Sequence, residues 1–196
     1  MEVVRLDPER LQEASVVLAR AFQEDPAWIW LIPDADRRRR LLPWLFRIGF
    51  DVTAADVWTT AGLIRGAARW LPPGRPPMRV APMLKALVTT PFRLGSAITP
   101  FLAYGRAVEA LRAETMPDPH WYLAGIGVEP SAQRHGVGSA LLEPGLTAAA
   151  RAGLPAVLLT NNEANIGFYE RHGFAVVREG ETPQGGPHAW AMVKPP

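Results

Sequence analysis

The sequence predicts an α+β fold in which helices and strands are mixed along the chain, and three patterns support this prediction. Residues 8–22 repeat apolar side chains at helical spacing. Residues 57–71 contain two strand-like stretches separated by the turn Ala61-Gly62. From residue 120 to the C-terminus the pattern reads strand, helix, strand, helix, strand, strand. A length of 196 residues suits a full core of its own, so we expect a single domain over residues 1–196.

The first half of the chain has five expected elements. These are a strand over residues 1–6, a helix over 8–22, a loop over 25–34, a helix over 35–51 and a hairpin over 57–71. The loop contains Trp28 and Trp30. Pro43 should kink the second helix, because proline removes a backbone hydrogen bond.

The middle of the chain, about residues 72–119, is expected to be the most variable part. Residues 72–82 are rich in proline and predict a connector within the domain. Apolar helices are expected over 83–113, with interruptions at Pro91 and Pro100. Prolines recur at 116–119 and end this segment.

Composition excludes several classes of function. Hydrophobic residues make up 48% and charged residues 20% of the chain, which is an ordinary globular balance. The net charge of +2 demands no nucleic-acid partner, and the arginine run at 37–40 is expected to be the solvated start of a helix. The absence of cysteine rules out disulfides and a cysteine nucleophile. With no signal sequence and no apolar run of ~20 residues, we expect a soluble cytoplasmic protein with no membrane partner.

An anion site is predicted where a strand, a glycine turn and a helix follow one another. The strand is 121–128, the turn is Gln133-Arg134-His135-Gly136-Val137-Gly138, and an apolar helical pattern begins at Val137. Free N–H groups and the positive end of the helix would both favour phosphate, and glycine lets it approach the backbone. A P-loop would need a lysine after Gly138, where Ser139 stands, and a dinucleotide loop would need a third glycine at Leu141. A purely structural glycine turn remains the alternative.

A second polar pair is predicted on the helix expected over residues 165–172. Asn165 and Tyr169 are four residues apart, so both project from one face of that helix. Strand 156–160 precedes the helix, and Gly173 should end it. By itself this pattern also suits a tyrosine that packs in the core and bonds a carbonyl group. One irregularity is Glu143-Pro144-Gly145 inside the preceding helix, which predicts a bent helix rather than two.

Taken together, these segments resemble the GNAT superfamily of N-acetyltransferases. The glycine turn is similar to the family's Gln/Arg-x-x-Gly-x-Gly/Ala loop, and residues 165–174 are similar to its N-x-x-F/A-Y-x-x-x-G-F block. The resemblance is nearer still to the puromycin N-acetyltransferases, strong over 120–196 and weak over 75–115. It implies a mostly antiparallel central sheet with two splayed strands, flanked by helices.

The resemblance also implies a reaction and its residues. Acetyl-CoA would lie between the splayed strands, with its pantetheine arm along Ile126, Gly127 and Val128. Its pyrophosphate would lie at residues 133–139, that is Gln133, Arg134, His135, Gly136, Val137, Gly138 and Ser139, with Asn165 also at the cofactor. Tyr169 would protonate the departing thiolate. An amine would attack the thioester directly in a ternary complex, and no metal is expected.

The acceptor is predicted to be a small hydrophobic amine, puromycin-like or a related metabolite. Leu159 stands where related enzymes commonly carry a glutamate, so it makes the acceptor side apolar, and Trp28 or Trp30 would line the pocket. Glu24, Asp25, His120 and Glu163 are possible bases. A non-catalytic acetyl-CoA sensor and an acetyltransferase of protein N-termini or lysines are the alternatives. Either a monomer or a homodimer is compatible with the sequence.

Overall fold

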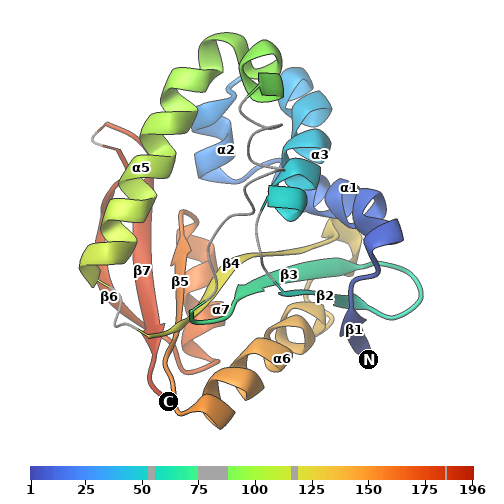
Figure 1. Cartoon of the computed structure of the whole chain (residues 1–196), viewed down its shortest axis with the longest axis vertical. Coiled ribbons are helices and arrows are strands. Elements are labelled where there is room, and N and C mark those ends of the chain that lie inside the picture. Colours follow the sequence, from blue (N-terminus) through green and yellow to red (C-terminus); the bar gives the residue numbers. More distant parts are fainter. Residues whose placement is uncertain (53–55, 75–87, 116–118, 184) are drawn as a thin grey trace.

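A computed structural model describes residues 1–52, 56–74, 88–115, 119–183 and 185–196. Its centre is a seven-stranded sheet in the order β1-β2-β3-β4-β5-β7-β6 (Figure 1). The strands are β1 (Val3–Arg5), β2 (Asp56–Thr60), β3 (Gly66–Leu71), β4 (Trp121–Val128), β5 (Ala156–Thr160), β6 (Ala175–Glu181) and β7 (His188–Lys194). All neighbouring strands are antiparallel except β4 and β5, which are parallel. The predicted α+β fold with a mostly antiparallel sheet is therefore confirmed.

Helices cover both faces of this sheet (Figure 1). One face carries α1 (Leu11–Ala21), α2 (Pro26–Leu31), α3 (Ala35–Val52) and α5 (Ile98–Thr115), and the other carries α6 (Val137–Ala152) and α7 (Ile166–Glu170). Short 3-10 turns lie at Pro8–Arg10, Gly95–Ala97, Pro130–Ala132 and Glu163–Asn165. Alternate residues of β3 enter different cores, because successive side chains of a strand point to opposite faces. Ala67 packs with α1 and α3, whereas Ala68 and Trp70 pack with α6.

The segment expected to be a loop over residues 25–34 contains a helix instead. α2 begins after Asp25, whose side chain accepts a hydrogen bond from the Ala27 N–H, and Pro26 occupies the first helical position. Asp-Pro is a helix-start signal, since aspartate caps the free N–H groups and proline needs none. The helix is only six residues long, too short to show helical periodicity in the sequence.

The arginine run at 37–40 is not wholly solvated, which corrects the expectation for it. Arg38 is only 3% exposed, and its guanidinium donates to the carbonyl oxygens of Gln23, Ile32 and Pro33. Arg37 reaches the Leu94 carbonyl oxygen at 2.5 Å. Both arginines bind backbone carbonyls of neighbouring segments, which local sequence cannot show.

Several helices contain a proline. α3 continues through Pro43, and α6 is one helix through Pro144 rather than two, as expected. Residues 88–94 and α5 are helical across Pro91 and Pro100, and the interruption falls at Gly95–Ala97 instead. Gly95 has a φ of 49°, a conformation that glycine adopts without strain.

Gly145 follows Pro144 in α6 and lies directly against β3. A Cβ atom at Gly145 would lie 2.1 Å from Trp70 Cε2, so the helix can approach β3 only where the side chain is missing. Trp70 is fully buried at this contact.

The helix expected over residues 165–172 is shorter in the structure. It is α7, which ends at Glu170, and the 3-10 turn Glu163–Asn165 precedes it. Most of the proline-rich connector, residues 75–82, lies outside the described residues. No helix among the described residues is both long enough and apolar enough to cross a membrane.

Candidate active site

The site lies where β4 and β5 separate. The two parallel strands pair only at Trp121↔Ala156, Tyr122↔Val157 and Leu123↔Leu158. Beyond Leu123, β4 continues to Val128 without pairing to β5. The backbone of the second half of β4 therefore faces a gap in the sheet, where a ligand can bind N–H and C=O groups.

The predicted anion loop lies at one end of this gap. Gly136 is the N-cap of α6 with a φ of 78°, and no side chain caps the helix. Arg134 also has a positive φ, 62°, which is uncommon for a residue with a side chain. An uncapped helix start leaves N–H groups that can bind an anion. Gly138 lies so close to Phe168 that a Cβ atom would be 3.2 Å from Phe168 Cζ.

A groove of about 650 Å³ runs from this loop to the splayed strands. Ten of the predicted cofactor residues line it: Ile126, Gly127, Val128, Gln133, Arg134, Gly136, Gly138, Ser139, Asn165 and Tyr169. Two do not. The side chain of Val137 is buried in the core beneath α6, and the exposed His135 ring bonds to the Gln133 carbonyl oxygen at 2.7 Å. Neither residue lines the groove in this structure.

A second, more enclosed cavity of about 340 Å³ lies on the α1, α2 and α5 side of the gap. Its apolar wall includes Leu18, Trp28, Leu31, Phe46, Phe101, Val108, Leu158 and Leu159. Its polar groups are Asp25, Arg69, Tyr104, Tyr122, Thr160, Asn161, Asn165 and Tyr169. A mostly apolar cavity with a few polar groups is typical of a small-molecule site.

The groove and the cavity meet at five shared residues. Phe22, Asp25, Ile126, Asn165 and Tyr169 line both. A ligand in the groove and a ligand in the cavity could therefore touch each other at this junction, which is what transfer between two substrates requires.

Tyr169 lies at the junction and is 6% exposed. Its ring packs edge-on against Phe168 and Phe174, with centroids 5.2 and 6.0 Å away. Burial raises the pKa of Tyr169 above its ordinary value, and the negative charges of Asp25 and ionised Tyr122 add to this. The hydroxyl thus stays protonated over the working pH range and can act as a hydrogen-bond donor.

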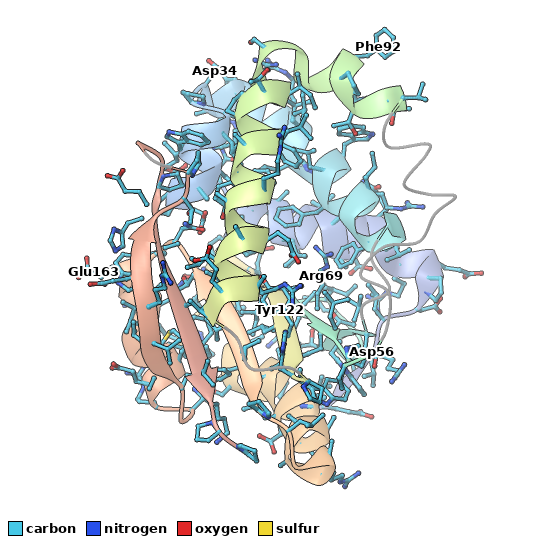
Figure 2. All side chains as sticks on the ribbon, turned by 60° about the vertical axis from the view of Figure 1, so that its left-hand side comes forward. Asp34, Asp56, Arg69, Phe92, Tyr122 and Glu163 are labelled. Atoms are coloured by element: carbon cyan, nitrogen blue, oxygen red, sulfur yellow. The ribbon has the colours of Figure 1, made fainter. Side chains whose placement is uncertain are left out.

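The four candidate bases have very different positions. Asp25 lies at the junction, and burial raises its pKa although backbone N–H groups of Ala27 and Trp28 oppose this. Glu24 has a side chain 79% exposed and lies 3.7 Å from Arg38. His120 is buried against Arg112, at 3.2 Å, and lines neither space. Glu163 lies at the outer edge of the molecule (Figure 2) and also lines neither.

Of the three residues predicted to contact the acceptor, two line the cavity and one does not. Trp28 and Leu159 line the cavity. Trp28 also packs against Phe46 and Phe101, at 5.5 and 6.3 Å between ring centroids. Trp30 packs against the core and does not line the cavity.

Several lining residues were missed by the sequence reasoning. Arg69 and Tyr122 lie beneath α5 (Figure 2), where burial lowers the pKa of Arg69 to about 10 and raises that of Tyr122 to about 12. A charged residue inside the apolar strand 66–71 could have indicated Arg69. α5 adds Phe101, Tyr104 and Val108, whose spacing marks one helix face.

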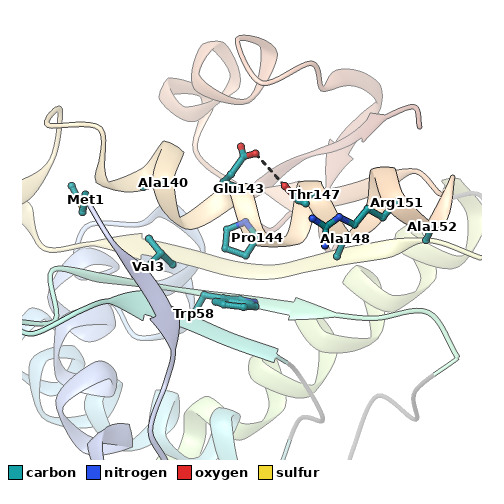
Figure 3. A pocket seen from close by; sticks show the side chains of 10 residues that line it. All are labelled: Met1, Val3, Trp58, Ala140, Glu143, Pro144, Thr147, Ala148, Arg151 and Ala152. Atoms are coloured by element: carbon teal, nitrogen blue, oxygen red, sulfur yellow. Dashed lines mark hydrogen bonds between the residues drawn. The ribbon is translucent and has the colours of Figure 1, made fainter.

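Another groove, of about 860 Å³, lies between β1 and α6 (Figure 3). It is lined by Met1, Val3, Trp58, Ala140, Glu143, Pro144, Thr147, Ala148, Arg151 and Ala152. The Thr147 hydroxyl donates to the Glu143 carboxylate at 3.1 Å, and no residue of the glycine loop or of α7 contributes. This groove is separate from the site.

Comparison with known proteins agrees with this geometry. Residues 86–174 match the sequence model of the family described as "Acetyltransferase (GNAT) family". This segment of the chain is therefore similar in sequence to the GNAT acetyltransferases. The matched segment contains α5, β4, the glycine loop, α6, β5 and α7, so it includes most of the elements that form the groove.

Solved structures show the same GNAT fold over the whole chain. A "histone acetyltransferase HPA2 and related acetyltransferase" from Corynebacterium glutamicum is 24% identical, with a TM-score of 0.67 over 99% of this chain and 95% of that one. A mosquito arylalkylamine N-acetyltransferase-like protein is 15% identical, with a TM-score of 0.59 over the full length of both chains. The ribosomal-protein-S18-alanine N-acetyltransferase from Escherichia coli is 18% identical, with a TM-score of 0.54 over 99% and 92%.

Proposed function

We propose that this acetyltransferase transfers acetyl from acetyl-CoA to the primary amine of a small, hydrophobic molecule. The observation that carries this proposal is the meeting of a long groove and a small aromatic cavity at Tyr169. A puromycin-like aminonucleoside or a related metabolite is the acceptor class that the sequence resemblance favours.

Acetyl-CoA fits the groove by charge and shape. The uncapped start of α6 and the cations of Arg134 and Arg171 line its end, and both would attract phosphate. The part of β4 from Ile126 to Val128 pairs with β3 but not with β5, so its β5-facing edge offers backbone groups to a pantetheine amide and to the thioester carbonyl.

The size of the acceptor cavity favours a small molecule over a protein chain. α5 covers the cavity, and the Tyr104 hydroxyl donates to Asn161 Oδ1 at 2.6 Å, which ties the helix to the end of β5. A volume of about 340 Å³ holds an aromatic amine, but a peptide would need an open groove. The fold neighbours include enzymes of both kinds, named for an arylalkylamine and for a ribosomal protein, so they do not decide this point.

The proposed chemistry needs no acyl-enzyme. The chain has no cysteine, so the amine nitrogen attacks the thioester carbonyl directly. The N–C bond forms, the C–S bond breaks, and the nitrogen loses a proton while the sulfur gains one. Tyr169 would donate its hydroxyl proton to the sulfur as the C–S bond breaks, and it would regain a proton from the amine nitrogen as the amide forms.

An amine panel with acetyl-CoA tests the proposal. Release of free CoA thiol would be measured with puromycin, 2-phenylethylamine, an aminoglycoside and a peptide with a free N-terminus. We expect puromycin or 2-phenylethylamine to give the highest kcat/KM. Preference for the peptide or the aminoglycoside would contradict the acceptor class, and tight CoA binding without turnover of any amine would favour a sensor.

A further inference from the structure

We propose that Asp25 binds the ammonium form of the acceptor amine and takes up its proton before transfer. This inference rests on the proposed function, since it concerns the amine that enters the cavity. It selects the base from the four candidates that the sequence offered. It also describes the acceptor as an ammonium cation attached to an apolar group.

The position of Asp25 is the first argument. Among the described residues that line the groove or the cavity, the carboxylates belong to Asp25 and Glu24, and only Asp25 lines both spaces. The Glu24 side chain is mostly exposed and faces Arg38. An amine that leaves the cavity to reach a thioester in the groove therefore passes Asp25.

The second argument is that Asp25 is held rigidly in place. The Ala27 N–H donates to its Oδ1 at 3.0 Å, so the carboxylate is also the N-cap of α2. Arg38 fixes the chain on both sides of Asp25, because it donates to Gln23 O at 2.7 Å and to Ile32 O and Pro33 O at 2.8 and 3.0 Å. A buried guanidinium that holds three backbone carbonyls around this segment suits a segment whose exact placement matters.

The surroundings of Asp25 in the cavity are the third argument. Three hydroxyls, from Tyr104, Tyr122 and Tyr169, and the guanidinium of Arg69 share the lining with it. Arg69 donates to Gly49 O at 3.2 Å and lies over the Phe50 ring. The negative charge of Asp25 helps to raise the pKa of both Tyr104 and Tyr169, so it acts on the junction. A cation bound there would relieve the cost of this partly buried charge.

The proton balance of the step is simple. The ammonium nitrogen gives one proton to the Asp25 carboxylate, and the neutral amine then attacks the thioester. The second proton, lost as the amide forms, goes to the sulfur with help from Tyr169. Asp25 returns its proton to solvent. Burial raises the pKa of Asp25. The difference between this pKa and that of an amine near ~8 is therefore smaller, which makes the proton transfer easier.

Asp25→Asn removes the negative charge at this position but keeps a side chain that can cap α2. Asparagine caps a helix about as well as aspartate, so α2 should persist while the negative charge is lost. The matched control is Asp34→Asn, since Asp34 receives the Arg37 N–H at 2.6 Å in the same capping role but lines neither space. Acetyl-CoA binding is measured in both variants to confirm that the groove is intact.

Two measurements test the inference, both with CoA present. At pH 7 the wild type should bind 2-phenylethylammonium at least ~10-fold more tightly than the neutral isostere 2-phenylethanol, and Asp25→Asn should remove this preference. With the better amine of the panel, kcat/KM should fall ~10²-fold or more at pH 7. Its decline toward acid pH should begin at higher pH in the variant, because only the fraction of amine that is already neutral can then react. Asp34→Asn should retain the wild-type preference and pH profile.

The contrary results are clear. A wild type with no preference for the ammonium compound would refute the role of Asp25. So would an Asp25→Asn protein that keeps both this preference and the wild-type position of the acid limb. The proposed function would survive such a result if the wild type still acetylates the panel amines. Failure of the function itself would show as no turnover of any amine by the wild type.

Discussion

At the scale of single residues, the proposed chemistry depends on two groups, Tyr169 and Asp25, whose burial changes their pKa. Tyr169 comes from α7 and Asp25 from the start of α2, and they are 144 positions apart in the chain yet line the same junction. Burial raises the pKa of both. A raised pKa keeps the tyrosine neutral. For Asp25 it means that the ionised carboxylate, the form that the proposed reaction needs, lowers the stability of the folded protein.

Tyr169→Phe should lower turnover with little change in CoA affinity. The substitution keeps the ring that packs against Phe168 and Phe174 and removes only the hydroxyl. Loss of a general acid is worth ~10²-fold or more in kcat. Steady-state kinetics together with calorimetric CoA binding would measure this. Full activity in a folded variant would return Tyr169 to a packing role.

Asp25→Asn should not destabilise the protein at neutral pH, and the difference from wild type should depend on pH. Because the folded pKa of Asp25 is raised, folding binds a proton, so its contribution is greatest below the unfolded pKa and is lost as pH rises through the folded pKa. The variant should therefore gain in relative stability from about pH 4 to pH 7. Urea unfolding at both pH values, with Asp34→Asn as control, would check the sign. Lower stability of Asp25→Asn at pH 7 would contradict it.

At the scale of elements, close contacts at glycine decide how α6 meets its neighbours. Gly138 allows the first turn of α6 to lie beside Phe168, and Gly145 allows its middle to lie on Trp70. One contact shapes the groove and the other anchors the helix on the sheet. A side chain added at Gly138 should therefore impair CoA binding, whereas one added at Gly145 should lower the stability of the protein.

Gly138→Glu should abolish CoA binding in a protein that still folds. The new carboxylate would stand at the uncapped helix start and repel phosphate, while its Cβ presses on Phe168. Isothermal titration with CoA would measure the loss. Gly180→Glu on β6, where nothing lies within 4 Å, is the control and should bind CoA normally. Equal affinity in the two variants would refute the placement of the pyrophosphate.

Gly145→Ala should destabilise the protein by ~1–3 kcal/mol, the usual cost of overpacking a core. Alanine gains about 1 kcal/mol of helix propensity, but a Cβ 2.1 Å from the buried Trp70 ring costs more. Gly105→Ala in α5 has open space around it and should stabilise. Denaturant unfolding of both variants would check the opposite signs. A stabilised Gly145→Ala would show that the helix can shift away.

At the scale of the whole molecule, the cavity proposed to hold the acceptor is built by parts of the chain that are far apart in sequence. α1, α2, α3, α5, β3, β4, β5 and α7 each contribute to its lining. α5 covers it through one face, and the Tyr104–Asn161 hydrogen bond links that cover to the strand below. The choice of acceptor should therefore be sensitive to α5, far in sequence from the glycine loop.

Phe101→Ala should raise KM for aromatic amines by ~10-fold and leave CoA affinity unchanged. Phe101 lines the cavity and packs against Trp28 at 6.3 Å, so its loss removes one wall but no catalytic group. The exposed Phe92→Ala is the matched control, because that ring is 88% exposed and lines neither space. An unchanged KM in Phe101→Ala would place the acceptor elsewhere.

The sequence by itself determined the strands, the main helices and the groove end of the site. Periodicity is a local property, and so is the run of Gln133, Gly136 and Gly138 before a helix, so both can be read along the chain. The helix α2 was missed because six residues carry too little periodicity, although Asp25-Pro26 did signal its start.

Only the tertiary structure decided which carboxylate lines the same junction as Tyr169 and which helix covers the cavity. The sequence does not distinguish between the candidate bases Asp25, Glu24, His120 and Glu163. Their burial, and whether they line the groove or the cavity, does. The same holds for Arg38, Arg69 and Tyr122, whose roles come from partners far along the chain. A side chain's charge state and access depend on everything packed around it, and that is set by long-range contacts that no local pattern contains.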